Sequence, residues 1–256
     1  MNADFGRTAR DYAGYRVGFP DAFFERLPVF GVGEAGQRVL DLGTGTGTLA
    51  RGFSSCGCEV TALDPASALL EQAERLDREA GVSVKYLVAT AEETGLPAEA
   101  FDVVSAGQCW HWFDRERVAR ESLWLLTSGG RLVIAHFDWI PLPSNVVEET
   151  ERLIELHNPA WALSGGTGLY PAWLSDVTLA GFVAVETFSF DATVPYTHEA
   201  WRGRIRASAG VAASLEPDQV QNFDDDLRRL LRDRFPEDPL QVPHRVFAVV
   251  CKKPWC

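Results

Sequence analysis

The sequence lacks several features that would place it in a specialised class of protein. No run of 18 apolar residues occurs among its 256 residues, so nothing in it predicts a membrane-spanning helix. The first ten residues, MNADFGRTAR, lack the apolar stretch of a secretory signal, so we expect a cytoplasmic protein. The five cysteines are odd in number and form no CxxC pair, so we expect free thiols and neither disulfides nor a zinc site.

Basic residues are also scarce. Lys and Arg together number 24 against 36 Asp and Glu, which gives a net charge of −12. A protein that binds nucleic acid neutralises phosphates with clustered basic side chains, so this balance argues against DNA or RNA as a partner. The sequence leaves monomer and homodimer both open.

Strand-like and helix-like segments alternate over the first 140 residues. Such alternation predicts βαβ units and a parallel sheet with helices on both faces. Beyond residue 141 the pattern loosens into helical segments, among them 146–157, a helix that ends at Gly181, and a largely helical insert before the last strand. The predicted strands span 37–42, 59–63, 82–89, 101–106, 131–137, 182–190 and 244–252, and the helices among the first five strands span 47–56, 67–80 and 115–126.

The segment 38–48, RVLDLGTGTGT, joins a strand that ends near Asp41 to three glycines, Gly43, Gly45 and Gly47. Glycine permits a positive φ and lets a ligand approach the main chain, so this turn predicts a nucleotide-like ligand at a helix N-terminus. Turns for dinucleotides read GxGxxG, whereas Thr48 stands here where the third glycine would fall. Asp41 would repel a diphosphate and suits a cationic ligand, and it can also serve as a hydrogen-bonded turn carboxylate.

Polar residues stand at the ends of the following strands as well. Asp64 lies 21 positions past Gly43, at the end of the second strand, where a carboxylate can accept hydrogen bonds from both ribose hydroxyls. The carboxyl ends of parallel strands meet at one edge of a sheet, so these side chains should converge there. The later strands are followed by Thr90-Ala91-Glu92, by Gln108-Cys109-Trp110-His111, and by His136 with Asp138.

These residues resemble the class I S-adenosylmethionine-dependent methyltransferases, with a likeness that covers about residues 5–140. DLGTGTG at 41–47 is similar to the family's first motif, and TAEETGLPAEAFDVV at 90–104 to its third and fourth strand region. LLTSGGRLVI at 125–134 is similar to a family turn in which a basic residue and proline usually replace Thr127-Ser128. The opening AxxYxxYRxGFP and the QxxHWF stretch look like the small-molecule, type 11-like subgroup.

The resemblance implies an α/β fold of Rossmann-like methyltransferase type: a doubly wound, mostly parallel seven-stranded sheet with an antiparallel last strand and a helical cap. It implies one domain over residues 1–256, in which 1–30 form helices over the cofactor. Segments 141–180 and 195–240 would then cap the acceptor pocket. The implied activity is methyl transfer from S-adenosylmethionine to a small molecule, such as a carboxylic acid or another metabolite.

The resemblance also assigns residues to the cofactor. The glycine turn would approach the methionine part, Asp41 its ammonium group and Asp64 the ribose, and Gln108 would stand near the transferable methyl. Thr90 stands where the family often has an acid, so adenine would be read by Glu92 or by backbone. Aromatic faces attract a sulfonium, although packing in the core or in a lid is the alternative for Trp110 and the preferred interpretation for Trp112. The expected cofactor residues are Tyr12, Asp41, Gly43, Gly45, Gly47, Asp64, Pro65, Ala91, Glu92, Gln108 and Trp110.

Catalytic candidates are His111 and, after it, His136, because a histidine at a strand end can take a proton from an oxygen or nitrogen nucleophile. Each could instead be a structural histidine, and a carboxylate nucleophile would need no base. Arginine could anchor an acidic acceptor, with salt bridges to the acidic 223–226 segment as the alternative. The expected acceptor residues are Tyr15, Arg16, Tyr170, Arg202 and Arg206.

Other functions remain open at this stage. A non-catalytic protein that binds S-adenosylmethionine would share the glycine turn and Asp64. An RNA methyltransferase would need a basic surface that the net charge of −12 argues against. A dehydrogenase is the weakest alternative, since the GxGxxG pattern is missing.

Overall fold

The computed structural model describes residue 15 and residues 17–255. Contacts within the chain divide it into two compact units. Among the described residues, the helical unit comprises Tyr15, Val17, Asp138–Leu169 and Asp191–Arg245, and the sheet unit comprises Gly18–Phe137, Tyr170–Phe190 and residues 246–255. The predicted cap segment 141–180 therefore belongs to the helical unit up to Leu169 and to the sheet unit from Tyr170.

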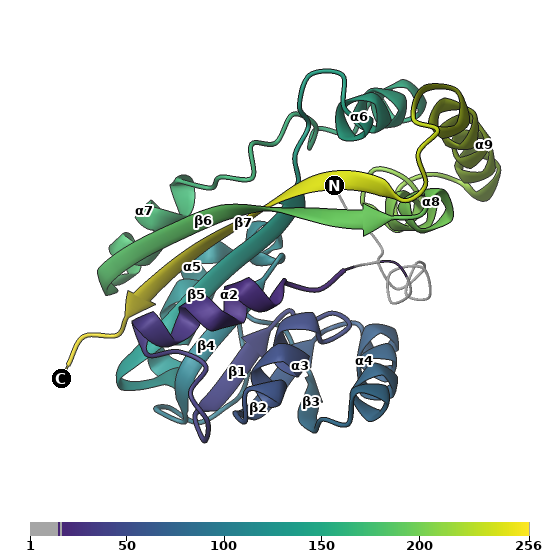
Figure 1. Cartoon of the computed structure of the whole chain (residues 1–256). Helices are drawn as coiled ribbons and strands as arrows, with labels where there is room; N and C mark the ends of the chain where they lie inside the picture. Colours follow the sequence, from purple (N-terminus) through teal and green to yellow (C-terminus); the bar gives the residue numbers. More distant parts are fainter. Residues whose placement is uncertain (1–14, 16, 256) are drawn as a thin grey trace. The chain divides into compact units, whose positions relative to one another are not determined.

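Seven strands form one sheet in the order β3-β2-β1-β4-β5-β7-β6. Strands β1 to β5 pair in parallel, and β7 runs antiparallel to its neighbours (Figure 1), so the predicted fold class is confirmed. Strand order reverses beside β1, which pairs with β2 on one side and β4 on the other, and ligands bind at such a switch point. The strands are β1 (Arg38–Leu42), β2 (Glu59–Asp64), β3 (Val84–Val88), β4 (Phe101–Gly107), β5 (Leu126–Trp139), β6 (Val183–Tyr196) and β7 (Leu240–Lys252).

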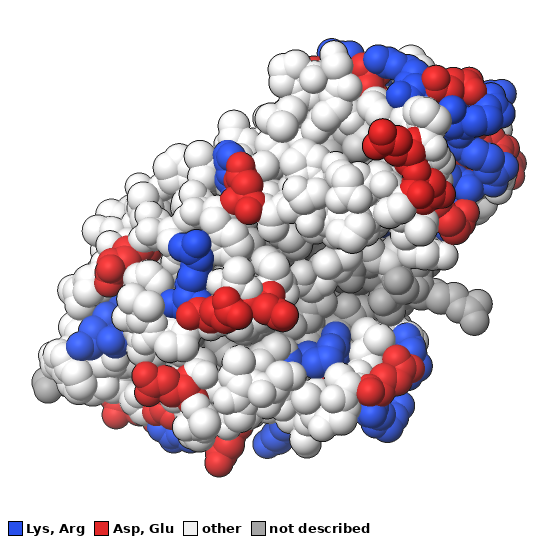
Figure 2. Space-filling model, viewed as in Figure 1, with Lys and Arg blue, Asp and Glu red and all other residues white. Residues whose placement is uncertain are grey.

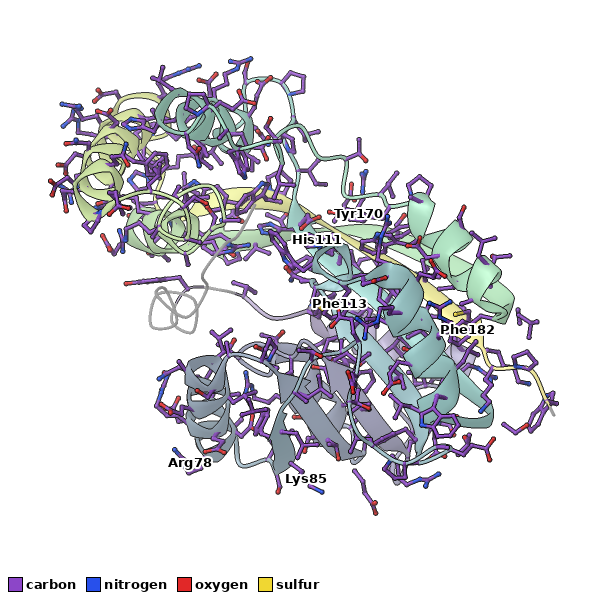
Figure 3. The ribbon with its side chains drawn as sticks, turned by 180° about the vertical axis from the view of Figure 1, so that it is seen from behind. Arg78, Lys85, His111, Phe113, Tyr170 and Phe182 are labelled. Carbon is purple, nitrogen blue, oxygen red and sulfur yellow. The ribbon has the colours of Figure 1, made fainter. Side chains whose placement is uncertain are left out.

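Helices cover both faces of the sheet within the sheet unit. Figure 1 shows α2 and α3 over one face, and Figure 3, seen from behind, shows α5 over the other. Residues 39–42 of β1 are buried throughout, as expected for a strand covered on both faces. The helices of this unit are α2 (Asp21–Arg26), η2 (Leu27–Phe30), α3 (Thr48–Ser55), α4 (Ser67–Ala80), η3 (Trp110–Trp112), α5 (Arg115–Leu125) and α7 (Ala172–Ala180).

The helical unit contains α6 (Val146–His157), α8 (His198–Arg206) and α9 (Pro217–Arg234). Its interior includes the fully buried Trp201, Phe223 and Leu227. Outside, basic and acidic side chains lie intermixed over the part of the surface where α9 runs (Figure 2). No helix of the described residues is long and apolar enough to cross a membrane.

Several predicted boundaries hold, and some need correction. Helix α6 spans 146–157 as predicted, and Gly81 and Gly181 end α4 and α7 in the left-handed conformation. Strand β5, by contrast, begins at Leu126 and not at 131, because Leu126 already pairs with Phe101 across a bulge. Of the segment 1–30 that was expected to form helices, residues 1–14 and 16 lie outside the described part of the chain. The four described cysteines, Cys56, Cys58, Cys109 and Cys251, are free thiols.

Candidate functional site

The glycine turn between β1 and α3 adopts the conformation that only glycine takes without strain. Gly43, Gly45 and Gly47 have φ values of 59°, 56° and 77°. Space excludes side chains as well: a Cβ on Gly43 would lie 2.9 Å from Phe113 Cζ, and one on Gly47 would lie 2.5 Å from Tyr86 Oη. The turn is therefore fixed by conformation and by packing, with its main chain close to any ligand at this edge.

A buried carboxylate behind the turn holds it in place. Asp77 of α4 accepts hydrogen bonds from Tyr86 Oη of β3 at 2.7 Å and from Arg51 Nη1 of α3 at 2.5 Å. Arg51 Nη2 in turn donates to the Thr46 carbonyl at 2.8 Å, inside the turn. Burial, and then the hydrogen bond to Asp77, raise the pKa of Tyr86. Sequence reasoning missed this cluster, since no motif or spacing joins its three residues.

Asp64 links the end of β2 to the glycine turn. Its Oδ2 accepts a hydrogen bond from the Gly45 N–H and its Oδ1 from the Ala66 N–H, both at 2.9 Å. Burial raises the pKa of this carboxyl, and the two backbone donors partly offset that effect. An ionised carboxylate has about four acceptor positions, so two remain for ligand hydroxyls.

Asp41 is buried at the end of β1, with 1% of its surface exposed. Its Oδ1 accepts a hydrogen bond from Ser105 Oγ of β4 at 2.7 Å. Burial raises the pKa of Asp41 to about 6, while hydrogen bonds from Ser105 and the Ala50 N–H work in the opposite direction. The group is thus ionised at neutral pH in a poorly solvated place, which makes it attractive to a cation. It is also the hydrogen-bonded carboxylate that the alternative interpretation expected.

The loop after β4 packs directly on the glycine turn. Cys109 Sγ lies 3.2 Å from the Leu42 carbonyl, and its side chain fills the space above Gly43. Gln108 has a φ of 60°, unusual for a residue with a side chain, and its N–H donates to the Ala135 carbonyl of β5 at 2.8 Å. Strained backbone of this kind is common at functional sites. The loop is therefore tied to β1 on one side and to β5 on the other.

The two tryptophans of this loop differ in their surroundings. Trp110 lies fully buried in the hydrophobic core, and its Nε1 donates to Asp176 Oδ2 of α7 at 3.1 Å. Trp112 is 40% exposed beside His111, with 4.6 Å between the ring centroids. Burial thus favours the packing role for Trp110, whereas Trp112 does not lie in the core; packing of Trp112 in a lid stays a prediction. Spacing within one turn of 3-10 helix does not reveal which side chain enters the core.

His111, His136 and Tyr170 form a hydrogen-bonded chain across the ends of β4 and β5. His136 Nε2 lies 3.2 Å from His111 Nδ1, and Tyr170 Oη lies 3.3 Å from His136 Nδ1. His136 is buried with 6% exposed, His111 is exposed, and the Tyr170 ring stacks on Trp173 with 4.2 Å between centroids. Figure 3 shows His111 and Tyr170 next to each other. The structure therefore brings together three residues that the sequence named separately.

Other predicted residues take different positions. Glu92 Oε1 accepts a hydrogen bond from the Asp114 N–H at 3.0 Å, just before α5, while Ala91 is buried and Pro65 exposed. Tyr15 lies in the helical unit, where its ring occupies the space beside Gly203 of α8. Tyr12 and Arg16 lie outside the described residues.

The two arginines predicted for the acceptor are engaged by carboxylates of the helical unit. Arg202 contacts Asp224 through Nε at 3.1 Å and through Nη2, and its Nη1 donates to Glu199 at 2.8 Å. Arg206 Nη1 donates to Asp224 at 2.8 Å. The exposed fractions of Arg202 and Asp224 are 7% and 5%. Salt bridges to the acidic 223–226 segment, the alternative interpretation, are what the structure contains, so we no longer place an acceptor on these arginines.

Two further observations limit the site. Among the described residues, no group of three or more His, Cys, Asp or Glu side chains could hold a metal ion. A shallow hollow bordered by Arg38, Glu59 and Phe101 lies at the amino ends of β1, β2 and β4, opposite the glycine turn. The candidate site is therefore the carboxyl edge of the sheet, built from glycines, two buried carboxylates and the histidine chain.

Comparisons with known proteins agree with this geometry. A family model described as a methyltransferase domain matches residues 40–134. An uncharacterised methyltransferase of Mycobacterium bovis is 36% identical over 133 residues, which are 52% of this chain and only about half, 51%, of that protein. A ubiquinone biosynthesis O-methyltransferase of Xanthomonas euvesicatoria is 31% identical over 180 residues, 68% of this chain and 72% of that one. The chain belongs to the class I S-adenosylmethionine-dependent methyltransferases.

A solved structure supports the fold of this methyltransferase. The YcgJ protein of Bacillus subtilis superimposes with a TM-score of 0.59 at 19% identity, covering 93% of this chain and 100% of that one. The matched family region ends at residue 134, so it includes the glycine turn, Asp64 and His111 but neither His136 nor Tyr170. Those two residues are features of this chain that the family model does not cover.

The family's cofactor, S-adenosylmethionine, fits the residues at this edge. The three glycines of the turn carry no side chains that could shield its main chain from a ligand. Asp64 retains acceptor positions for ribose hydroxyls, and Asp41 supplies an anion for a ligand ammonium. The predicted family and cofactor are confirmed, whereas the roles of the individual site residues remain predictions.

Proposed function

We propose that this protein transfers the methyl group of S-adenosylmethionine to a small molecule. The observation that carries the proposal is the exposed His111, which follows β4 in a loop packed on the glycine turn and is hydrogen-bonded to His136. A protein that only binds the cofactor needs the turn and Asp64 but no proton acceptor beside them. The relative from Xanthomonas euvesicatoria, an O-methyltransferase of ubiquinone biosynthesis, supports a small-molecule acceptor.

The site residues would act mainly by position. When bound, S-adenosylmethionine supplies an electrophilic methyl group on a positively charged sulfur. The glycine turn and Asp64 would hold the ligand in one orientation, which allows in-line attack and lowers the entropic part of the barrier. Asp41 would bind the ammonium group, and the exposed face of Trp112 would attract the sulfonium. His111 would accept the proton of the attacking group.

RNA as the acceptor has less support. The net charge is −12, and the face drawn in Figure 2 carries both signs of charge without a continuous basic patch. A phosphate backbone is held by clustered Lys and Arg, so this surface does not favour it.

The test is transfer of a labelled methyl group from S-adenosylmethionine to a panel of phenols, alcohols, amines and carboxylic acids. We expect transfer to at least one class, and loss of it in Asp64→Asn. Asp102→Asn is the matched control, because Asp102 pairs with Arg38 at the opposite end of the sheet and should leave transfer intact. Binding of S-adenosylhomocysteine with no transfer across the panel would favour a non-catalytic binding protein. Salt-sensitive binding of RNA would revive the RNA alternative.

A further inference from the structure

We infer that His136 and Tyr170 are positioning residues that set His111 up as a general base, and that the acceptor therefore gives up an O–H or N–H proton when it is methylated. This inference rests on the proposed function and narrows its substrate class. Both residues lie outside the region matched by the family model. The inference is based on the hydrogen bonds that join His111 to His136 and His136 to Tyr170.

The hydrogen-bonded chain of His111, His136 and Tyr170 has an exposed end at His111 and a buried centre at His136. His136 is 6% exposed and uses both ring nitrogens within the chain, Nε2 toward His111 at 3.2 Å and Nδ1 toward Tyr170 at 3.3 Å. Its ring also contacts those of Tyr170 and Trp173, with centroids 4.7 Å and 5.6 Å away. Aromatic rings on this side and His111 on the other hold its orientation. His111 alone presents a large surface to an incoming molecule.

Such a chain can carry its protons in two directions. In one, the Tyr170 hydroxyl donates to His136 Nδ1, His136 Nε2–H donates to His111 Nδ1, and His111 keeps its own proton on Nε2. In the other, His111 Nδ1–H donates to His136 Nε2, and His136 Nδ1–H donates to the Tyr170 oxygen. Only the second direction leaves a lone pair on His111 Nε2. The tautomer of a histidine is set by the partner of its other nitrogen. In the second direction, the Tyr170 oxygen holds the proton on His136 Nδ1, and the His136 Nε2 lone pair holds the proton of His111 on Nδ1.

The second direction suits the charge that methyl transfer creates. The O–H or N–H bond of the acceptor breaks and its proton moves to His111 Nε2, while the oxygen or nitrogen bonds to the methyl carbon. The electron pair of the carbon–sulfur bond returns to sulfur, so the positive charge passes to the His111 ring. There, the lone pair of His136 Nε2 accepts from Nδ1–H and the Trp112 ring lies 4.6 Å away, and both stabilise the cation. The exposed ring then releases its proton to water.

One carboxylate near these three side chains is held by partners of its own. Asp176 of α7 binds Arg115 of α5 at 3.2 Å and also accepts from Trp110 Nε1 at 3.1 Å. Asp176 is thereby engaged by Arg115 and Trp110, and the hydrogen bond that orients His111 here comes from His136.

This arrangement distinguishes between acceptor classes. A carboxylate already has its nucleophilic lone pair and gains nothing from a base. A phenol, alcohol or protonated amine must lose a proton, and a general base contributes about 10²- to 10⁴-fold to such reactions. A histidine held as a general base at the carboxyl edge of the sheet therefore assists methylation of phenols, alcohols and amines but not of carboxylates.

The first test reads the tautomer of His111 directly and needs no substrate. Nitrogen-15 NMR of the imidazoles at pH 8 should show His111 protonated at Nδ1 in the wild type. In Tyr170→Phe, which keeps the ring on Trp173 and removes the oxygen, the proton should move to Nε2. His111 protonated at Nε2 in the wild type, or a tautomer that Tyr170→Phe leaves unchanged, would overturn the inference even if no acceptor is ever found.

The second test uses the acceptor that emerges from the labelled panel. We expect His111→Gln to lower kcat about 100-fold or more. Tyr170→Phe should lower kcat and shift its pH profile, and neither variant should change KM for S-adenosylmethionine more than about twofold. His157→Gln is the control, because His157 pairs with Asp226 in the helical unit. Transfer to carboxylic acids only, at a rate that His111→Gln does not alter, would overturn the inference while supporting the proposed function.

Discussion

Asp41 combines a structural cost with a proposed binding role. Its pKa in the folded protein is raised to about 6 from 3.8, first because of burial, so the folded state holds a proton between these values that the unfolded state has lost. The free energy of unfolding therefore falls as pH rises from about 3.8 through 6, and this loss of stability stays complete above pH 6. We expect Asp41→Asn to be more stable than wild type at pH 8 by about 1–3 kcal/mol.

Thermal unfolding across pH 4 to 8 checks this prediction. The gain of Asp41→Asn should shrink below pH 6 and disappear below pH 3.8. Asp102→Asn should show the opposite pH dependence, because the hydrogen bond from Arg38 lowers the pKa of Asp102. This variant should be slightly less stable than wild type at pH 8, and the difference should fade in acid. An Asp41→Asn protein that is less stable than wild type at pH 8 would contradict the burial argument.

The same carboxylate makes a prediction for the ligand. An ionised Asp41 attracts the ammonium group of S-adenosylhomocysteine, so affinity should fall as pH drops through about 6. Isothermal titration at pH 8, 7, 6 and 5 measures this directly. In Asp41→Asn the affinity should be weaker at pH 8 and should no longer depend on pH in this range. If the affinity for S-adenosylhomocysteine depends on pH in the same way in both proteins, Asp41 does not bind the ammonium group.

The positions and roles of some single residues could be predicted from the sequence, and those of others could not. Asp41, Asp64 and the glycines stand in a motif whose spacing fixes where the backbone brings them. Arg202 and Trp110 carry no such constraint, and their roles depend on burial and on partners far along the chain, Asp224 and Asp176. Spacing alone cannot reveal these partners.

At the scale of elements, the glycine turn is the most constrained connection. Gly47→Ala would place a Cβ in a left-handed position and against Tyr86 Oη, whereas Gly81→Ala has a similar φ of 70° with nothing within 4 Å. We expect Gly81→Ala to cost about 1 kcal/mol and Gly47→Ala more, and only Gly47→Ala to weaken binding of S-adenosylhomocysteine. Urea unfolding and calorimetric titration of both variants measure the difference.

A third variant separates strain from crowding. Gly47→Ala combined with Tyr86→Phe removes the oxygen that the new Cβ would meet, so binding should recover in part. If Gly47→Ala and Gly81→Ala behave alike in both measurements, close packing behind the turn has no role.

Element boundaries were predicted well where a chemical signal marks them. Gly81 and Gly181 end their helices because the backbone there needs a positive φ. Helix α9 begins at Pro217, ahead of the acidic 223–226 segment, because a capping box between Glu216 and Gln219 marks its start. Strand β6 extends to Tyr196, beyond the predicted end at residue 190. Its last residues alternate between exposed and buried, and such alternation is harder to recognise in a sequence than the continuous apolar run of β1.

At the scale of the whole chain, the helical unit depends on a buried ionic cluster. Burial opposes ionisation of Asp224, but hydrogen bonds from Arg202 and Arg206 outweigh it and lower the pKa of Asp224. Asp224→Asn would leave two guanidinium groups poorly compensated in the interior, and we expect a loss of about 3 kcal/mol. Asp225→Asn, whose carboxylate is 46% exposed beside Arg228, should change stability by about 0.5 kcal/mol or less.

Chemical denaturation of both variants tests the cluster, and cofactor binding at 25 °C serves as its functional control. The glycine turn belongs to the sheet unit, so folded Asp224→Asn should bind S-adenosylhomocysteine within about twofold of wild type. Equal stability of the two variants would contradict a structural role for Asp224.

The sequence was sufficient for the parallel part of the sheet, because each parallel strand and its helix leave a local pattern, whereas the antiparallel last strand was implied by the family resemblance. It was insufficient for the division into two units, which depends on contacts between distant segments such as 138–169 and 191–245. The histidine chain falls between these cases: each member was named, but only the fold joins Tyr170 to His136 across 34 positions.

The central claim is that the carboxyl edge of this sheet binds S-adenosylmethionine through the glycine turn and Asp64. Calorimetric titration at pH 8 with S-adenosylhomocysteine and, separately, with NAD tests it most directly. We expect S-adenosylhomocysteine to bind, NAD to show no binding, and Asp64→Asn to weaken the first at least about tenfold while Asp102→Asn leaves it unchanged. Tighter binding of NAD than of S-adenosylhomocysteine, or equal affinities in the two variants, would contradict the claim.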